Sequence, residues 1–117
     1  MKAVIQNEFG GVDVLLYTDV EIPKVGEGEV LIKGSYTSVN YADIKTRIGT
    51  KGKGNFPLIL GLDVAGVIED VSPNSTFSKG DRVIAFPKSG SYAEYVVANE
   101  KLLFKIPDVL PLDKAVY

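Results

Sequence analysis

The chain of 117 residues contains no cysteine and no histidine. The lack of cysteine excludes disulfides, thiol nucleophiles and thiolate metal sites. The lack of histidine removes the commonest general base and the commonest zinc ligand, so Ser-His-Asp catalysis and histidine-based metal sites cannot be built from this chain. A metal ion would depend on carboxylates alone, and we expect no metal site.

Strong charge of one sign and long hydrophobic runs are also lacking. There are 13 basic and 15 acidic residues, giving a net charge of −2, so nucleic acid is a poor partner. The apolar runs are far shorter than a membrane span, and the first residues contain no signal-peptide core. We therefore expect a cytoplasmic protein of one domain, with no nucleic-acid or membrane partner.

Short runs of β-type residues, separated by Gly, Pro and Asn, dominate the chain. We predict strands over residues 2–6, 12–17, 30–36, 64–71, 82–86, 92–98 and 102–106. Their spacing favours a barrel or a sandwich over repeated βαβ units.

One internal segment, residues 40–48, has helical periodicity. Tyr41, Ile44 and Ile48 recur at i, i+3 and i+7 and therefore share one face. A second helix begins at Pro111 with a start signal and no stop signal. We expect one or two short helices, and a chain that is the first part of a larger protein.

The internal helix has clear end signals. Asn40 can cap its first turn, and Asp43 follows three residues later in the acidic position of a capping box. Gly49 then supplies the C-terminal stop.

The glycine-rich segments do not form nucleotide-binding motifs. Gly26 and Gly28 open like a dinucleotide fingerprint, but Leu31 occupies the third glycine position and a strand follows. Residues 49–54 have the spacing of a phosphate loop, yet Asn55 and Phe56 follow where Lys and Ser or Thr are needed. We expect residues 49–55 to be a flexible loop, with a lid over a neighbouring pocket as the alternative.

Two glycines flank Asp63, which suggests that the backbone closely approaches a neighbour at Gly61 and Gly66. Tyr92 and Tyr95 fall on opposite faces of their predicted strand, so at most one of them points into the core. Residues 79–81 are interpreted as a turn that leads into a strand.

Four segments together are much more specific than these signals: residues 38–43, 57–69, 77–83 and 90–97. In this order and spacing they resemble the N-terminal catalytic domain of medium-chain dehydrogenases/reductases, the superfamily of alcohol dehydrogenases and quinone oxidoreductases. The resemblance covers essentially the whole chain. It implies that residues 1–117 form a mainly β, GroES-like, partly open barrel, followed in the complete protein by a Rossmann domain that this chain lacks.

The departures from the family pattern indicate the branch. Zinc-dependent members carry a metal-ligand cysteine where this sequence has Asn40 and a histidine where it has Leu62. An amide and an alkyl group cannot replace a thiolate and an imidazole around catalytic zinc. Asp63 stands where zinc enzymes carry a Glu near the metal. The chain is therefore similar to the zinc-free, NADPH-dependent quinone oxidoreductase branch, with its enoyl- and acrylyl-type reductases.

The resemblance also implies site residues. In this branch the residue matching Asn40 lies against the nicotinamide ribose, and the position of Tyr41 approaches the cofactor phosphates in zinc members. Lys45 and Arg47 match positions near the substrate, although Lys45 replaces the tyrosine that some quinone reductases carry there. The alternatives are that Asn40 only caps the helix, that Tyr41 packs against Ile44, and that Lys45 and Arg47 are solvated charges.

These points predict the catalytic-domain part of a zinc-independent, NAD(P)H-dependent oxidoreductase that reduces a quinone or an activated alkene or carbonyl. Its partner is a small-molecule substrate, and the resemblance implies a homodimer for the full-length protein. A non-catalytic GroES-like binding or scaffold module is the alternative. Because no motif here grips a pyrophosphate, we expect the isolated chain to be inactive.

Overall fold

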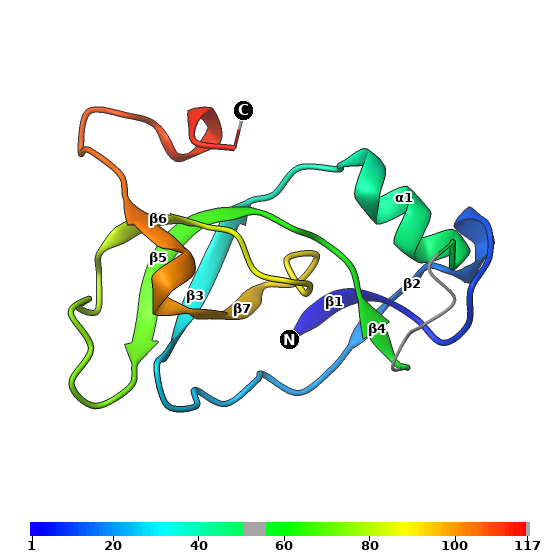
Figure 1. Ribbon diagram of the computed structural model, residues 1–117, viewed down its shortest axis with the longest axis horizontal. Coiled ribbons are helices and arrows are strands. Elements are labelled where there is room, and N and C mark those ends of the chain that lie inside the picture. The colour runs from blue at the N-terminus through cyan, green and yellow to red at the C-terminus, as the bar shows by residue number, and fades with distance from the viewer. Residues whose placement is uncertain (51–55, 117) are drawn as a thin grey trace.

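Two antiparallel sheets make up most of the computed structural model, which describes residues 1–50 and 56–116 (Figure 1). The first sheet has the order β2-β1-β4, with bounds Leu16–Asp19, Lys2–Gln6 and Leu58–Ile59. The second has the order β7-β3-β5-β6-β8, with bounds Tyr95–Asn99, Glu29–Tyr36, Val64–Val71, Arg82–Ala85 and Leu103–Lys105.

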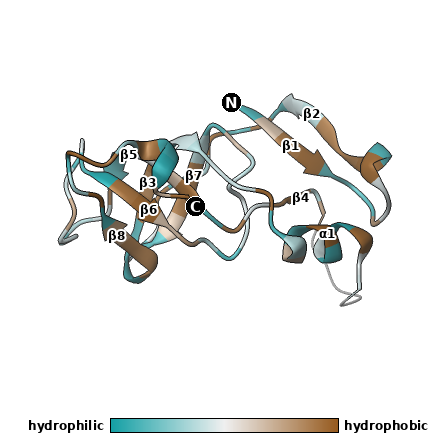
Figure 2. Cartoon of the chain, turned by 90° about the horizontal axis from the view of Figure 1, so that it is seen from above, coloured by the Kyte–Doolittle hydropathy of each residue, from teal (hydrophilic) through white to brown (hydrophobic). Residues whose placement is uncertain are grey.

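Main-chain hydrogen bonds join the two sheets where the chain enters β7. Ala3 and Ala93 form an isolated antiparallel bridge, and the Val4 N–H donates to the Tyr92 carbonyl at 2.9 Å. Within the described residues no pairing closes a complete ring, so the arrangement is a partly open barrel, 38 × 28 × 24 Å in extent (Figure 2). The predicted mainly β, partly open fold is confirmed.

The core lies within the five-stranded sheet and follows the alternation of β3 and β5. Val30 and Ile32 are fully buried, and on β5 Val64 and Ile68 complete the same layer. The cluster also contains Val83, Ala85, Val96, Ala98 and Leu103. Buried β-branched side chains on alternate positions fix the register, because a one-residue slip exposes them all.

Two glycines permit close packing of the backbone, as the sequence predicted. A Cβ at Gly66 on β5 would lie 2.2 Å from the Lys33 carbonyl oxygen on β3. A Cβ at Gly61 would lie 2.0 Å from Ser91 Oγ, and Gly61 has a φ of +112° that disfavours other residues.

Helix α1, Tyr41–Ile48, begins and ends where the capping residues predicted. Asn40 is the N-cap, and its backbone N–H donates to Asp43 Oδ2 at 3.0 Å. Gly49 adopts the left-handed conformation and its N–H donates to the Lys45 carbonyl at 3.0 Å.

The apolar face of α1 is exposed in this chain. Tyr41, Ile44 and Ile48 expose 69%, 37% and 53% of their surface, whereas Asp43 exposes 3%. The periodicity therefore predicted the helix correctly and its burial wrongly. Hydrogen bonds hold α1 against the rest of the chain, at the Asp43 carboxylate in its first turn and at Arg47 in its last.

Residues 12–17 were predicted as one strand, which is wrong for the first half. Val12–Val14 form a 3-10 turn (η1), in which the Val14 N–H donates to the Gly11 carbonyl at 3.1 Å. The strand β2 starts only at Leu16. A Cβ at the preceding Gly10 would lie 2.6 Å from Val14 Cγ1, so glycine at this position leaves room for the turn.

The predicted strand over residues 92–98 begins later than expected, at Tyr95. The Tyr92 N–H donates to the Leu60 carbonyl at 3.0 Å, so this stretch bridges the sheets before it enters the ladder with β3. Tyr92 lies outside β7, so the predicted opposite faces of Tyr92 and Tyr95 on one strand do not apply; both residues are half-buried and line different pockets.

The end of the chain also differs from the prediction. The strand predicted over residues 102–106 is found as β8, Leu103–Lys105, but it starts one residue late. Leu102 instead ends a 3-10 turn, Glu100–Leu102 (η2), in which Asn99 Oδ1 accepts the Lys101 N–H at 2.9 Å. After Pro111 only a 3-10 turn forms, Leu112–Lys114 (η3), in place of the start of an α-helix.

The two-residue strand β4 was missed, because it is too short to show alternation. The loop predicted over residues 49–55 falls mostly on residues 51–55, which lie outside the described residues. Across the part of the chain that is described, no helix is long and apolar enough to cross a membrane.

Candidate functional site

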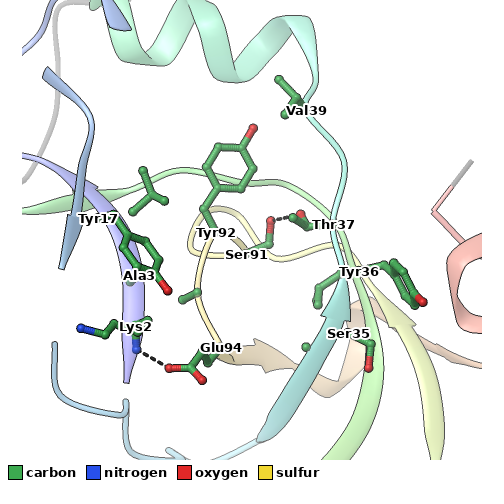
Figure 3. A pocket seen from close by; sticks show the side chains of 14 residues that line it. Lys2, Ala3, Tyr17, Ser35, Tyr36, Thr37, Val39, Ser91, Tyr92 and Glu94 are labelled. Atoms are coloured by element: carbon green, nitrogen blue, oxygen red, sulfur yellow. Dashed lines mark hydrogen bonds between the residues drawn. The ribbon is translucent and has the colours of Figure 1, made fainter. Parts of the chain in front are cut away.

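A pocket of about 440 Å³ opens between β1 and the end of β3, a size typical of small-molecule sites (Figure 3). Apolar groups of Ala3, Val4 and Val64 line it, and Thr37, Ser91 and Tyr92 add hydroxyls. In Figure 3 the Tyr92 ring stands in the pocket wall with its hydroxyl toward α1. The pocket therefore lies directly beside the residues that lead into the helix.

Asp43 connects this pocket to the start of α1. Its buried carboxylate accepts the Tyr92 hydroxyl at 2.9 Å and the Asn40 N–H at 3.0 Å through Oδ2, and the Gly61 N–H at 3.2 Å through Oδ1. Partial burial and the hydrogen bond to Asp43 raise the pKa of the Tyr92 phenol. Tyr92 is therefore protonated and donates its hydroxyl hydrogen to Asp43.

Asp63, exposed by 9%, holds the segment that precedes the helix. Its Oδ1 accepts the Ser38 N–H at 2.8 Å and its Oδ2 accepts the Ser38 hydroxyl. Thr37 Oγ1 donates to the Asp63 carbonyl at 2.6 Å. At 3.5 Å, Asn40 Nδ2 donates to Ser38 Oγ. Asp63 thus holds Thr37 and Ser38, while Asp43 ties the start of α1 to Gly61 and Tyr92.

The structure places three of the sequence-predicted site residues together. Asn40 lies half-buried at the start of α1, Tyr41 is exposed beside it, and Lys45 Nζ lies 4.9 Å from the centre of the Tyr41 ring. Arg47 lies elsewhere: its Nε donates to the Gly10 carbonyl at 3.2 Å, and its carbonyl accepts the Gly10 N–H at 3.0 Å. Among the described residues that line the pocket, none is one of these four.

Sequence reasoning missed the hydroxyl-bearing residues of the site. Ser38, Thr37, Ser91 and Tyr92 gave no motif by themselves, and their partners lie 25 to 54 residues away along the chain. A usable signal was the polar pair Thr37-Ser38, which Val39 separates from the capping Asn40.

The residues at this site do not fit a catalytic zinc ion. Asn40 and Leu62 stand where the family resemblance places zinc ligands, and the Leu62 side chain has no donor atom. Asp43 and Asp63 already accept protein N–H and O–H groups. In residues 1–50 and 56–116, no three His, Cys, Asp or Glu side chains are grouped so that they could hold a metal ion.

Across residues 1–50 and 56–116, a partly open, mainly β barrel with one α-helix is the architecture of a GroES-like domain. Residues 26–108 match the family model described as the alcohol dehydrogenase GroES-like domain. The chain belongs to this family.

Relatives and solved structures support the same assignment. The chain is 44% identical to the quinone oxidoreductase of Lama guanicoe, covering 97% of this chain and 36% of that protein. It is 40% identical to the chloroplastic NADPH-dependent alkenal/one oxidoreductase of Arabidopsis thaliana, covering 88% and 30%. A mycobacterial protein solved in complex with NADPH superposes with a TM-score of 0.88 at 35% identity, covering 95% and 35%. The chain thus spans about a third of the length of these proteins.

Proposed function

We propose that this chain is the catalytic-domain part of a zinc-independent, NADPH-dependent oxidoreductase that reduces a quinone or an activated alkene or carbonyl. The main support is that 97% of the chain is matched by a protein named quinone oxidoreductase at 44% identity. The alkenal/one oxidoreductase supports the wider substrate class and the cofactor. The hydrogen-bonding pair of Asn40 and Ser38, at the place where zinc enzymes bind metal, supports zinc independence.

The donor set at the start of α1 fits a nicotinamide cofactor. A carboxamide both donates and accepts, so Asn40 can bind a ribose hydroxyl. The exposed Tyr41 phenol and the Lys45 ammonium beside it suit the cofactor phosphates or the substrate. Most of the cofactor-binding energy is assigned to the Rossmann domain proposed for the complete protein. Bound NADPH supplies the hydride.

In this proposal the chain's own residues bind and orient the cofactor and the substrate, and they exclude water from the site. Asn40 holds the cofactor, and a hydroxyl, a backbone N–H or Asn40 itself stabilises the negative charge that develops on the acceptor oxygen. Lys45 remains available to the substrate. Arg47 is proposed to contribute as well, although its side chain is tied to Gly10. The complete protein is proposed to be a cytoplasmic homodimer. The molar mass of the full-length protein, measured by light scattering, tests whether it is a dimer.

The proposal is tested by comparing the chain alone with a chimera. The chain replaces the matching third of the Lama guanicoe quinone oxidoreductase, and NADPH-dependent quinone reduction is measured for both. We expect turnover by the chimera and none by the chain alone, whose NADPH affinity is expected to be no better than about millimolar, since one or two hydrogen bonds contribute about 1 kcal/mol each.

Asn40→Ala in the chimera is the matched variant, and it is expected to lower kcat/KM by about tenfold through loss of one cofactor contact. A folded chimera that binds NADPH but does not reduce quinone contradicts the catalytic proposal. That result favours the binding or scaffold module.

We further predict that the purified, tag-free chain holds no zinc. The reason is that Leu62 offers no ligand atom and the chain contains no cysteine or histidine. Elemental analysis after gel filtration measures the metal content, and stoichiometric zinc that survives dialysis against a weak chelator overturns this prediction.

A further inference from the structure

We propose that Asp63, acting through Ser38, is a positioning residue that fixes which way the Asn40 carboxamide faces. The proposal deepens the proposed function and rests on it, because the orientation matters for a ligand only if Asn40 binds one. The three side chains form one chain of hydrogen bonds, from the carboxylate of Asp63 to the hydroxyl of Ser38 to Nδ2 of Asn40.

The direction of each hydrogen bond in this chain is determined by chemistry. A carboxylate accepts and does not donate. Asp63 Oδ1 accepts the backbone N–H of Ser38 at 2.8 Å, and Oδ2 accepts the Ser38 hydroxyl hydrogen. A hydroxyl has one hydrogen, so Ser38 Oγ can only accept from its third neighbour. Asn40 must therefore turn its amino group toward Ser38, where Nδ2 lies at 3.5 Å.

This orientation has a consequence for recognition. With the amino group toward Ser38, the carboxamide oxygen lies on the other side of the planar group. There it serves donors: the N–H groups of the first turn of α1, in keeping with the capping box of Asn40 and Asp43, or a ligand hydroxyl. The reversed carboxamide would present N–H to N–H at the helix start.

Asp63→Asn is a nearly isosteric change that reverses the direction of the hydrogen bonds between residue 63, Ser38 and Asn40. The Ser38 backbone N–H cannot turn, so it keeps the new carboxamide's oxygen as its acceptor. The new amino group then faces Ser38 Oγ and donates to it. The Ser38 hydroxyl hydrogen must point elsewhere, toward Asn40, and Asn40 is expected to reverse and present its oxygen to Ser38.

The experiment is NMR of the 117-residue chain, with the Asn40 side-chain amide signals assigned through Asn40→Gln. The parent is compared with Asp63→Asn, Ser38→Ala and the control Ser91→Ala. Ser91 belongs to the same network, with Oγ 2.7 Å from Thr37 Oγ1, but does not bond to Ser38 or Asn40. We expect both test variants to shift the Asn40 side-chain signals and to speed exchange of its protected amide hydrogen by roughly fivefold to tenfold. Ser91→Ala is expected to leave these signals unchanged.

Asn40 signals that are the same in the parent, Asp63→Asn and Ser38→Ala overturn the proposal, because the helix cap alone then sets the orientation. If Asp63→Asn does not fold, Ser38→Ala decides by the same criterion. The NADPH affinity of the chimera with and without Asn40→Ala provides a separate readout, because the isolated chain is expected to bind NADPH no better than about millimolar. If Asn40→Ala leaves the affinity of the chimera unchanged, the cofactor role of Asn40 fails while its positioning by Asp63 stands.

Discussion

Gly66→Ala is expected to lower the free energy of unfolding by about 3 kcal/mol, a large part of the 5–15 kcal/mol of a typical domain. The added Cβ would lie 2.2 Å from the Lys33 carbonyl oxygen and 3.0 Å from Ile32 Cγ2. The first of these atoms belongs to the backbone of β3, which cannot move away as a flexible side chain can. The strands β3 and β5 must therefore separate within the core sheet.

Urea unfolding followed by circular dichroism measures this loss. Gly11→Ala is the matched control, because its Cβ would meet only the mobile Asp13 carboxylate, at 3.2 Å, and its φ is −79°. We expect the control to change stability by less than about 0.5 kcal/mol. Equal midpoints for the two variants would show that β3 and β5 have room at this position, contrary to the packing described.

Asp43→Ala is expected to destabilise the chain by about 3–5 kcal/mol. Asp43 is only 3% exposed, and its carboxylate accepts hydrogen bonds from Asn40, Gly61 and Tyr92. Removing it leaves donors from three segments without their acceptor, and each buried unsatisfied donor costs about 1–3 kcal/mol. The expected loss is smaller than the sum of these three costs, because Tyr92 is half-buried and water can reach its hydroxyl.

Tyr92→Phe is the control for this prediction, since it removes only one of the donors and is expected to cost about 1 kcal/mol. Thermal unfolding of the parent and both variants gives the ranking. A loss for Asp43→Ala no larger than that for Tyr92→Phe would mean that the two backbone N–H groups do not depend on this carboxylate.

The raised pKa of Tyr92 also predicts the direction in which the stability of the chain changes with pH. Burial and the Asp43 carboxylate disfavour the phenolate in the folded chain, while the unfolded chain ionises near pH 10. Below that pH both states hold the proton, so stability is unaffected. Above it the unfolded state loses protons first, and stability falls as the pH rises. In Tyr92→Phe this part of the decrease is expected to disappear.

The strands β1 and β5 and the helix α1 could be predicted from the sequence because their signals are local. Residues 2–6 and 64–71 are the predicted strands without change. Asn40, Asp43 and Gly49 cap α1 by bonds that reach no further than the adjacent turns. The 3-10 turns at Val12–Val14 and Glu100–Leu102 were missed, although their hydrogen bonds are local. Residues such as Val12, Val14 and Leu102 suit a strand equally well, so the residue types do not distinguish a short turn from a strand.

The sequence by itself determined the mainly β class, the capped helix, the family and the presence of Asn40 and Leu62 where zinc ligands stand in related enzymes. Only the tertiary structure decided that Asp43 is the buried residue of α1 and that its apolar face is exposed. It alone joined Asp63 to Ser38, and Asp43 to Tyr92, across 25 and 49 residues of chain. The physical reason is that capping and alternation are fixed by near neighbours, whereas a carboxylate's partners depend on which segments the sheets bring together.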